Sequence, residues 1–394
     1  MTEAADERWT PERMMMREVA RDFARDVVLP LANRLDPVKG DIPGELIDQM
    51  GELGFFGILI PEEYGGLGLG AFEYCIVAEE LSRAWMSVGS LIARGNAFYK
   101  AVGGTDEERR DKIARMAKGR YLGAAALSEP GTGSDLSGVA CRARRDGDEW
   151  VITGNKYWCT FADGADFISV LCRVDNGETS GGGRAPTVSV IVEKPRGELP
   201  TGVSGSPIPK IGYHGWKTWE LHFDAVRAPA HPERTAGKGF EEAAAGLGVA
   251  RAHTAARSIG LARAALEDAI AYAKERVQFG EPISNFQAIR FKIATMATEI
   301  EAARQLMYHV CTQIDAGRSA RTEISMVKYF AAEMAERVTS DALQILGGAG
   351  YTTLHAVERH WRDARLTKIF EGTSEIQQRI IADLLLGKPV LKPT

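Results

Sequence analysis

The hydrophobic period of the chain changes twice, and this change limits the folds that it can adopt. Over residues 1–122 apolar side chains recur at helical spacing, and Thr10 followed by Pro11 is typical of a helix start. Over 123–235 the period is two, with an Asp-Gly pair between alternating segments that predicts a hairpin. Long helical patterns return over 236–394. The sequence therefore predicts a mostly helical α+β chain with a β-domain between two helical domains.

Composition excludes several classes of function. The chain has 394 residues and a formal net charge of -5, which argues against nucleic-acid and anionic-membrane partners. No stretch approaches the roughly 18 apolar residues of a membrane span, and the acidic N-terminus lacks the apolar run of a secretory signal. Five scattered cysteines without a CxxC pair indicate reduced thiols and a cytoplasmic location. The histidines show no ligand spacing, so we predict no metal site.

Three motifs have the composition of ligand-binding segments, but each also fits ordinary structure. "LSEPGTGSD" (127–135) can wrap a ligand with backbone N–H groups or be a simple turn, and it lacks the βαβ surroundings of a dinucleotide fingerprint. In "GNKYWCTFADGAD" (154–166), Trp158 and Thr160 share a face if the segment is extended, where they can cover a flat ring; a core tryptophan fits equally. "QILGGAGYT" (344–352) fits either close approach of a ligand or a helix cap.

Taken together and in order, "LSEPGTGSD", "GNKYWCT", "ERVQFGEPISNFQ", "QILGGAGYT" and "IFEGTSEIQ" resemble the acyl-CoA dehydrogenase family of flavoproteins over nearly the whole chain. The resemblance implies an N-terminal helical domain, a central β-barrel or sandwich domain and a C-terminal four-helix bundle. It implies non-covalent FAD between the β-domain and the C-terminal helices. It also implies an acyl-CoA substrate and an electron-transferring flavoprotein as the electron acceptor.

The resemblance assigns FAD contacts to separate parts of the chain. Leu127, Ser128 and Gly133 would lie along the flavin, Trp158 would cover the isoalloxazine, and Thr160 would bond near its N5 edge. The contacts that in the family reach a neighbouring subunit's FAD match Arg276, Gln278, Phe279, Gln287, Gln344, Gly347 and Gly348. Two further FAD contacts match Thr373 and Glu375. FAD sites shared between subunits imply a homo-oligomer, commonly a dimer of dimers.

Glu371 matches the catalytic base of the family, which removes the pro-R α-proton of the thioester while the β-hydride moves to the flavin and the trans-2-enoyl-CoA forms. Some members carry the base immediately before an arginine that corresponds to Arg251. Here that position is Ala250, which cannot take a proton, so Glu371 is the expected base. The resemblance also places Ser134 along the CoA chain, Gly372 beside the substrate, and Arg251 against CoA or the catalytic loop.

The segment that follows Glu371 reads as the start of a helix. Ser374 and Gln377 are spaced as a capping box. The predicted apolar stripe of this helix runs through Ile376, Ile380, Ile381 and Leu384.

Arg94 interrupts the apolar run "VGSLIARGNAF" and bears on the choice of acyl group. A buried cation needs a partner, and a substrate carboxylate would supply one; the alternatives are exposure to solvent or pairing with Glu79 or Glu80. "ELSR…VGSL…R" together with "PKIGYHGWKTWELHFD" is most similar to 2-methylsuccinyl-CoA dehydrogenase and related enzymes. We therefore expect a short, branched or acidic acyl chain.

Two other functions are compatible with this fold. A same-fold acyl-CoA oxidase or desulfinase-type enzyme would change the reaction, and retention of Glu371 favours dehydrogenation over both. A non-catalytic CoA-binding scaffold would require loss of the base or of the flavin contacts, and the sequence shows neither loss.

Overall fold

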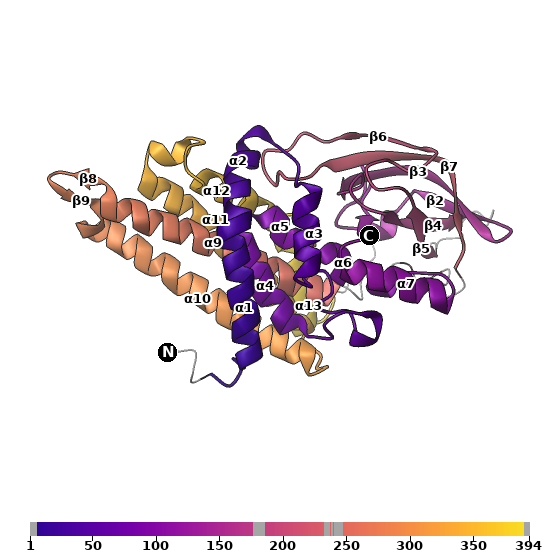
Figure 1. Cartoon of the computed structure of the whole chain (residues 1–394), viewed down its shortest axis with the longest axis horizontal. Coiled ribbons are helices and arrows are strands. Elements are labelled where there is room, and N and C mark those ends of the chain that lie inside the picture. The colour runs from indigo at the N-terminus through magenta and orange to yellow at the C-terminus, as the bar shows by residue number, and fades with distance from the viewer. Residues whose placement is uncertain (1–5, 176–185, 232–236, 238, 240–246, 390–394) are drawn as a thin grey trace.

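A computed structural model describes residues 6–175, 186–231, 237, 239 and 247–389, and its three parts follow the three periods of the sequence. N-terminal helices, a central sheet and long C-terminal helices succeed one another along the chain (Figure 1). The segment "DNGETSGGGRAPT" (175–187) is glycine-rich, and its composition predicts a turn between strands. Most of it lies outside the described residues. Within the described residues, no helix combines the length and the apolar character needed to cross a membrane.

The N-terminal part is helical, as predicted. Its helices are α1 (Pro11–Phe23), α2 (Leu29–Leu35), α3 (Gly44–Glu52), α4 (Ala71–Ala84), α5 (Met86–Leu91), α6 (Ala93–Asn96) and α7 (Asp106–Ala117). The predicted start at Thr10 and Pro11 is confirmed, because the Thr10 hydroxyl accepts a hydrogen bond from the amide of Arg13. Helix α4 is buried along almost its whole length.

The central part is a seven-stranded sheet of order β1-β4-β2-β3-β7-β6, with β5 paired to β4 off this path. Its strands are β1 (Gly123–Ala126), β2 (Arg142–Asp146), β3 (Glu149–Thr160), β4 (Phe167–Asp175), β5 (Thr187–Glu193), β6 (Val203–Pro207) and β7 (Thr218–Pro229). The predicted hairpin is confirmed: Asp146 pairs with Glu149, and Gly147 turns the chain at a φ of 60°.

The C-terminal part consists of long helices and one small hairpin. Its elements are α9 (Leu247–Glu275), β8 (Val277–Gln278), β9 (Glu281–Pro282), α10 (Gln287–Asp315), α11 (Arg321–Leu346), α12 (Val357–Thr367) and α13 (Ser374–Leu386). Helix α9 packs against α4, α10, α11 and α12. It is therefore a main connection through which the N-terminal and C-terminal parts share one core, and α10 also packs against α4.

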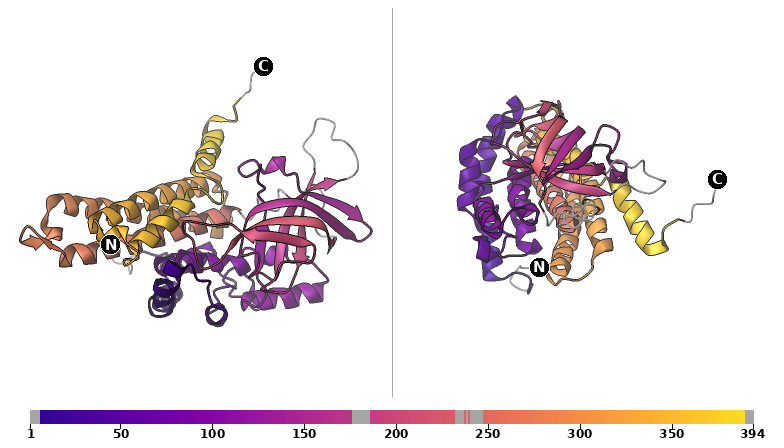
Figure 2. Two further views of the ribbon diagram at one scale, coloured as in Figure 1. Left: turned by 90° about the horizontal axis from the view of Figure 1, so that it is seen from above. Right: turned by 90° about the vertical axis from the view of Figure 1, so that its right-hand side faces the viewer.

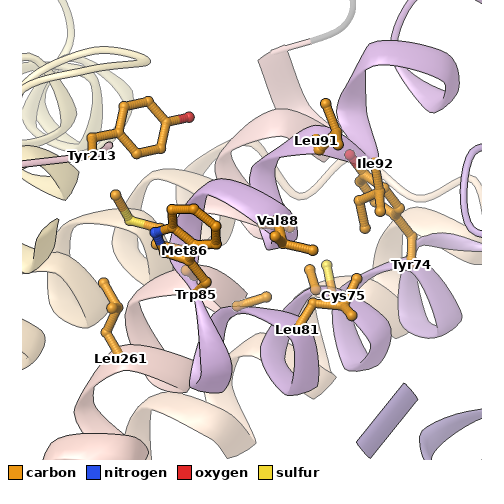
Figure 3. Packing of buried hydrophobic residues seen from close by; sticks show 14 of the residues in the cluster. Tyr74, Cys75, Leu81, Trp85, Met86, Val88, Leu91, Ile92, Tyr213 and Leu261 are labelled. Atoms are coloured by element: carbon orange, nitrogen blue, oxygen red, sulfur yellow. The ribbon is translucent and has the colours of Figure 1, made fainter. Parts of the chain in front are cut away.

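Figure 3 shows where that shared core meets the central part of the chain. Side chains of α4 and α5 pack beside Leu261 of α9 and Tyr213, which comes from the connection between β6 and β7. Trp85 and Met86 are fully buried and form part of this core. The position of Tyr213 ties the sheet to the helices that surround the site described below.

A carboxylate at the end of α10 fixes the start of α4. Asp315 accepts hydrogen bonds from the amides of Ala71 and Phe72 at 2.6 and 3.1 Å, which satisfies the free N–H groups of that helix end. A Cβ on Gly70 would lie 2.6 Å from this carboxylate, so the close approach requires glycine.

The start of α13 differs from the prediction. Thr373, not Ser374, is the N-cap, and its hydroxyl accepts from the amide of Ile376. The Ser374 hydroxyl instead donates to Glu333, and the Gln377 side chain donates to the Gly372 carbonyl, so the predicted capping box is wrong. The C-terminal half of α13 projects from the bundle (Figure 2), and Leu384 at the end of the predicted stripe is 40% exposed.

Candidate active site

Glu371 lies in the turn between α12 and α13, in a backbone conformation that a side chain rarely adopts. Its φ is 55°, and Gly372 follows at 89°. A non-glycine residue in this region costs about 1–3 kcal/mol, so its surroundings must hold it there. They do so through the Gly372 carbonyl, which accepts from Lys328 Nζ at 2.7 Å and from Gln377 Nε2 at 3.1 Å.

Two residues of α9 contact the carboxylate of Glu371. Arg257 Nη2 donates to Oε1 at 2.8 Å, and the Thr254 hydroxyl contacts Oε2. The single hydroxyl proton of Thr254 can go to Oε2 or to the Ala250 carbonyl, which lies 3.0 Å away. Arg257 therefore engages Oε1, the Thr254 hydroxyl lies within reach of Oε2, and the carboxylate meets the face of α9 that carries Ala250.

Arg257 is buried with one acid and several neutral groups. Its side chain is 2% exposed against 30% for Glu371. Besides Glu371, it donates to Ser90 Oγ at 2.7 Å and to Thr254 Oγ1 at 2.9 Å. The guanidinium also lies 4.6 Å from the centre of the Phe370 ring. Sequence reasoning missed Arg257 and Thr254, although their spacing from Ala250 along one helix face was a usable signal.

Further cations surround the same carboxylate. Burial lowers the pKa of Lys328 to about 8, although the nearby Glu371 favours its charged form. Burial likewise lowers the pKa of Arg251, again with Glu371 acting in the opposite direction. Arg251 therefore lies near the catalytic loop, as one of its two expected positions requires. Positive charge exceeds negative charge around Glu371.

Arg94 has no hydrogen-bond or ion-pair partner among the residues that the structure describes. Its guanidinium lies 5.1 Å from the ring centre of Trp216 and 5.6 Å from that of Phe161, and its inaccessible Nε is unpaired. Burial lowers its pKa, Arg257 lowers it further, and Glu371 raises it. Arg94 therefore lies within electrostatic range of the candidate base.

The alternative partners expected for Arg94 are excluded by their own contacts. Glu79 pairs with Arg263 and Arg304 at 2.8 and 3.0 Å. Glu80 pairs with Arg263 and with Arg21. These carboxylates link α4 to neighbouring helices, so neither is the partner of Arg94.

The turn over 127–135 is fastened to β3 behind it. The Leu127 carbonyl accepts from Lys156 Nζ at 3.1 Å, and the Ser128 carbonyl accepts from the Tyr157 amide at 2.8 Å. Buried Glu129 pairs with Lys156 at 2.8 Å. The outer part of the turn is open, because a Cβ on Gly133 would meet nothing within 4 Å. The turn can therefore receive a ligand without moving its anchored end.

Trp158 corrects the geometry assumed from the sequence. Its φ is 64°, and the pairing of β3 with β7 shifts register between Lys156 and Cys159, so the segment is not regularly extended and the shared face with Thr160 does not follow. Trp158 is 56% exposed, which also excludes the core tryptophan. The Thr160 hydroxyl lies 3.0 Å from that of Thr218.

The remaining expected FAD residues lie elsewhere. The β8–β9 hairpin is at the opposite end of the molecule from the seven-stranded sheet (Figure 1), and its tip residue Phe279 is 95% exposed. Arg276, Gln278, Gln287, Gln344, Gly347 and Gly348 are all exposed as well. Within one chain, the hairpin residues Gln278 and Phe279 are therefore separated from the sheet that carries Trp158 and Thr160. Thr373 and Glu375 stand at the first turn of α13, beside Glu371.

Comparison with known proteins gives the family. Residues 10–120, 124–226 and 237–386 match the N-terminal, middle and C-terminal domains of acyl-CoA dehydrogenase, respectively. The chain belongs to the acyl-CoA dehydrogenase family. It is therefore an oxidoreductase of acyl-CoA thioesters, and it depends on FAD as this family does.

Three similar proteins illustrate the range of this family. (2S)-Methylsuccinyl-CoA dehydrogenase of Cereibacter sphaeroides is 39% identical over 95% of this chain and 70% of its own length. Subunit CarC of the caffeyl-CoA reductase–Etf complex of Acetobacterium woodii is 36% identical over 96% of this chain and all of its own. The crystal structure of a glutaryl-CoA dehydrogenase from Mycobacterium smegmatis in complex with FADH2 gives a TM-score of 0.88 at 27% identity, covering 99% of each chain.

The described residues of this acyl-CoA dehydrogenase fit FAD. Exposed Trp158 offers an aromatic face where a flat ring can stack, and the turn at Gly133 has free space for a ligand. Gly347 and Gly348 are equally open, since a Cβ on either meets nothing within 4 Å. Exposed aromatic and glycine positions of this kind are what a large planar cofactor with a diphosphate needs.

Proposed function

We propose that this chain dehydrogenates a short acyl-CoA that carries a carboxylate, with Glu371 as the base that takes the α-proton. The observation that carries the proposal is the geometry around α9. Glu371 reaches the face of α9 that bears Ala250, so the alternative position for a base is adjacent and is occupied by a methyl group. The strained turn and its two donors at the Gly372 carbonyl keep Glu371 in this position.

The backbone at Glu371 also suits the second requirement of the reaction. Removing an α-proton places negative charge on the thioester oxygen, which must be stabilised by hydrogen-bond donors. Within the part of the chain that the structure describes, the Glu371 amide donates to no acceptor, and its residue is partly exposed. We assign this N–H to the thioester oxygen. When bound, FAD supplies the acceptor for the β-hydride.

The surroundings of Arg94 support the assignment of an acyl chain that carries a carboxylate. The Arg94 guanidinium lies over two aromatic rings and has no acid partner among the described residues, which is costly unless a ligand brings the counter-charge. The relatives named for methylsuccinyl-CoA and glutaryl-CoA act on acyl groups with a carboxylate. We therefore assign Arg94 to the acyl carboxylate, Arg251 to the catalytic loop, Ser134 to the CoA portion, and Gly372 to close approach of the substrate.

Several partners of this chain are part of the same proposal. The relative named as part of an Etf complex supports an electron-transferring flavoprotein as the electron acceptor. The separation of Phe279 and Arg276 from Trp158 supports a homo-oligomer, with dimers pairing to tetramers, in which FAD bridges two chains. All five cysteines are buried free thiols, which supports a reducing cytoplasm.

Anaerobic bleaching of bound flavin tests the reaction. We expect yellow protein that is bleached within a panel of butyryl-, isobutyryl-, 2-methylsuccinyl- and glutaryl-CoA. Glu371→Gln should keep its FAD and lose about 100- to 10,000-fold of the bleaching rate, the usual contribution of a general base. Glu45→Gln, on the exposed side of α3, is the matched control and should behave as the wild type.

The outcomes separate the competing functions. Substantial turnover by Glu371→Gln would refute the assigned base. Peroxide formation in place of electron transfer to an added acceptor would favour an oxidase. Colourless protein that takes up no FAD would favour the non-catalytic scaffold.

A further inference from the structure

The ion pair between Arg257 and Glu371 raises a problem for the proposed reaction. A carboxylate that removes a C–H proton needs a free lone pair directed at that proton. Here Oε1 is held by Arg257 and Oε2 is contacted by Thr254. Hydrogen bonds to the charged form of an acid weaken it as a base. The structure therefore shows the Glu371 carboxylate stabilised in its charged form by Arg257, and this ion pair opposes transfer of a proton to it.

Arg257 cannot release Glu371 without a substitute. Its side chain is almost completely buried, and its other partners, Ser90, Thr254 and the Phe370 ring, carry no charge. Breaking a buried ion pair by removing one member leaves an uncompensated charge, which is strongly unfavourable. A neutral acyl chain offers nothing to compensate it. A second carboxylate does.

The same region is prepared for a second carboxylate. Arg94 has no acid partner among the described residues, and its guanidinium lies over the Trp216 ring. Trp216 packs against Tyr213, and Tyr213 packs against Phe370, the ring beside the Arg257 guanidinium. Among the described residues, Arg257 is paired with the Glu371 carboxylate and Arg94 is paired with none. Two guanidinium groups with a single counter-ion leave room, in charge, for one more anion.

We infer that Arg257 gates the base: a carboxylate on the acyl chain takes over the ion pair with Arg257 and so releases Glu371 to accept the α-proton. This inference rests on the proposed function, because it requires Glu371 to be the base. It differs from the role assigned to Arg94, which concerns binding of the acyl carboxylate. Arg257 instead controls the rate constant of proton removal after the substrate is bound.

The gate also defines the substrate class. The released Glu371 carboxylate must reach the α-proton, and the acyl carboxylate must reach Arg257, which lies beside Glu371. The acyl carboxylate therefore has to lie close to the α-carbon. In a succinyl skeleton the carboxylate is attached to the β-carbon and satisfies this condition. In longer dicarboxylic chains it lies farther from the α-carbon. The inferred substrates are therefore thioesters of C4 dicarboxylic acids, with or without a methyl branch.

Two matched thioesters test the gate on the wild-type holoenzyme. 2-Methylsuccinyl-CoA and 2-methylbutyryl-CoA differ only in a carboxylate that replaces a methyl group. Anaerobic stopped-flow measurements of flavin reduction give the saturating rate constant and the apparent Kd for each. We expect the saturating rate constant to be about 100-fold larger for the acidic thioester, a ratio within the range of general-base catalysis.

Arg257→Gln supplies the second arm, because glutamine keeps hydrogen-bond donors and removes the charge. The saturating rate constant should fall for 2-methylsuccinyl-CoA and rise about tenfold for 2-methylbutyryl-CoA, since Glu371 no longer has a charged partner. Arg257→Lys should restore the preference in part. A merely structural role for Arg257 would lower both saturating rate constants by the same factor, and Arg257→Lys would then leave their ratio unchanged.

Failure of the gate and failure of the proposed function look different. If no thioester bleaches the wild-type flavin, the proposed function is wrong and the gate falls with it. If both thioesters bleach it with equal saturating rate constants, or Arg257→Gln slows both equally, the gate is wrong and Glu371 remains the base. Circular dichroism and FAD content show whether the variant is folded. If it is not, the ratio of rate constants for the wild type decides the question alone.

Discussion

At the scale of single residues, Arg94 is held by aromatic rings where most buried arginines have a carboxylate. Trp216 and Phe161 flank its guanidinium, and cation–π contacts of this kind stabilise a desolvated cation by about 2 kcal/mol. That is less than the several kcal/mol that burying an unpaired ion costs. The rest of this unfavourable desolvation energy is offset when an acidic ligand binds and pairs with Arg94.

Arg94→Met tests the pairing of Arg94 with an acyl carboxylate, because methionine keeps an unbranched side chain of similar length and removes the charge. The apparent Kd for 2-methylsuccinyl-CoA should weaken by about 10- to 100-fold, the equivalent of a charged hydrogen bond worth 1.5–3 kcal/mol. The Kd for 2-methylbutyryl-CoA should stay within about threefold, because it makes no such bond. Spectral titration of the flavin measures both. Arg115→Met, on the exposed face of α7, is the control; equal weakening of the two thioesters by Arg94→Met would remove the assigned role.

The residues at the site differ in how far the sequence predicted them. Glu371 was predicted from its match to the catalytic base of the family, and Arg94 was singled out because it interrupts an apolar run. The pairing of Arg257 with Glu371 spans 114 positions and depends on how α9 packs against the turn before α13, which no local pattern encodes. Lys328 was missed for the same reason, since its partner is the Gly372 carbonyl. Long-range contacts between a helix and a turn are set by tertiary packing.

At the scale of elements, α12 connects the site to the sheet. Asp363 on α12 accepts from the amide of Tyr213 at 2.5 Å, and Tyr213 packs against Phe370 and Trp216. Asp36 lies nearby and is paired with Arg362 at 2.6 Å. Burial, then repulsion from Asp36, raises the pKa of Asp363 to about 7. A protonated carboxyl thus helps to seat the loop that carries Tyr213.

This pKa predicts a pH dependence of stability. The folded pKa of about 7 exceeds the ordinary value of 3.8, so the folded chain holds a proton that the unfolded chain has lost. The contribution of the protonated Asp363 carboxyl to the free energy of unfolding is therefore fully present below pH 3.8. It is lost as the pH rises through 7. Asp363→Asn imitates the protonated form and keeps the acceptor for Tyr213. It should be more stable than the wild type by about 1–3 kcal/mol at pH 8, and nearly equal to it at pH 4.

Denaturant unfolding at pH 4, 6 and 8 measures this difference. Asp22→Asn, on the exposed side of α1, serves as the control and should leave the pH dependence unchanged. The opposite outcome is a free energy of unfolding that is lower for Asp363→Asn than for the wild type by the same amount at every pH. It would show that the carboxyl of Asp363 stays ionised in the folded chain.

Elements were predictable where local chemistry decides them. The cap at Thr10 and the Asp-Gly hairpin depend on neighbouring residues, and both were confirmed. The start of α13 was misplaced by one residue because Ser374 is bonded to Glu333 of α11, which removes it from capping. The turn of the chain at Trp158 was missed because a register shift in β3 depends on its partner strand β7. Tertiary partners override local signals at these places.

At the scale of the whole molecule, the expected FAD residues form two groups that one chain does not bring together. Trp158 and Thr160 belong to the sheet, whereas Arg276 and Phe279 lie at the β8–β9 hairpin at the other end (Figure 1). An aromatic side chain that is 95% exposed at a hairpin tip is costly for a monomer and useful at an interface. We therefore expect the hairpin of one chain to complete the FAD site of another.

The double variant Arg276→Ala/Phe279→Ala tests this arrangement. Its FAD content after desalting should fall severalfold, because it loses a diphosphate partner and an aromatic contact, while circular dichroism should show an intact fold. Light scattering should show a smaller mass if the same contacts hold the chains together. Ile211→Ala, at another site that is 75% exposed, is the control and should change neither FAD content nor mass.

Mixing two inactive chains distinguishes a shared site from a defect within one chain. The hairpin variant keeps Glu371 and its sheet, and the Glu371→Gln chain keeps its hairpin. We consider a mixed dimer in which each site is formed by the sheet and Glu371 of one chain and the hairpin of the other. One of its two sites then has an unmutated sheet and Glu371 from the hairpin variant and an unmutated hairpin from the Glu371→Gln chain. Random assortment should therefore restore about one quarter of the wild-type bleaching per site, by the symmetry of a two-fold dimer. If FAD were bound within single chains, every site in the mixture would still carry a defect, and refolding or co-expressing the two chains would restore no bleaching.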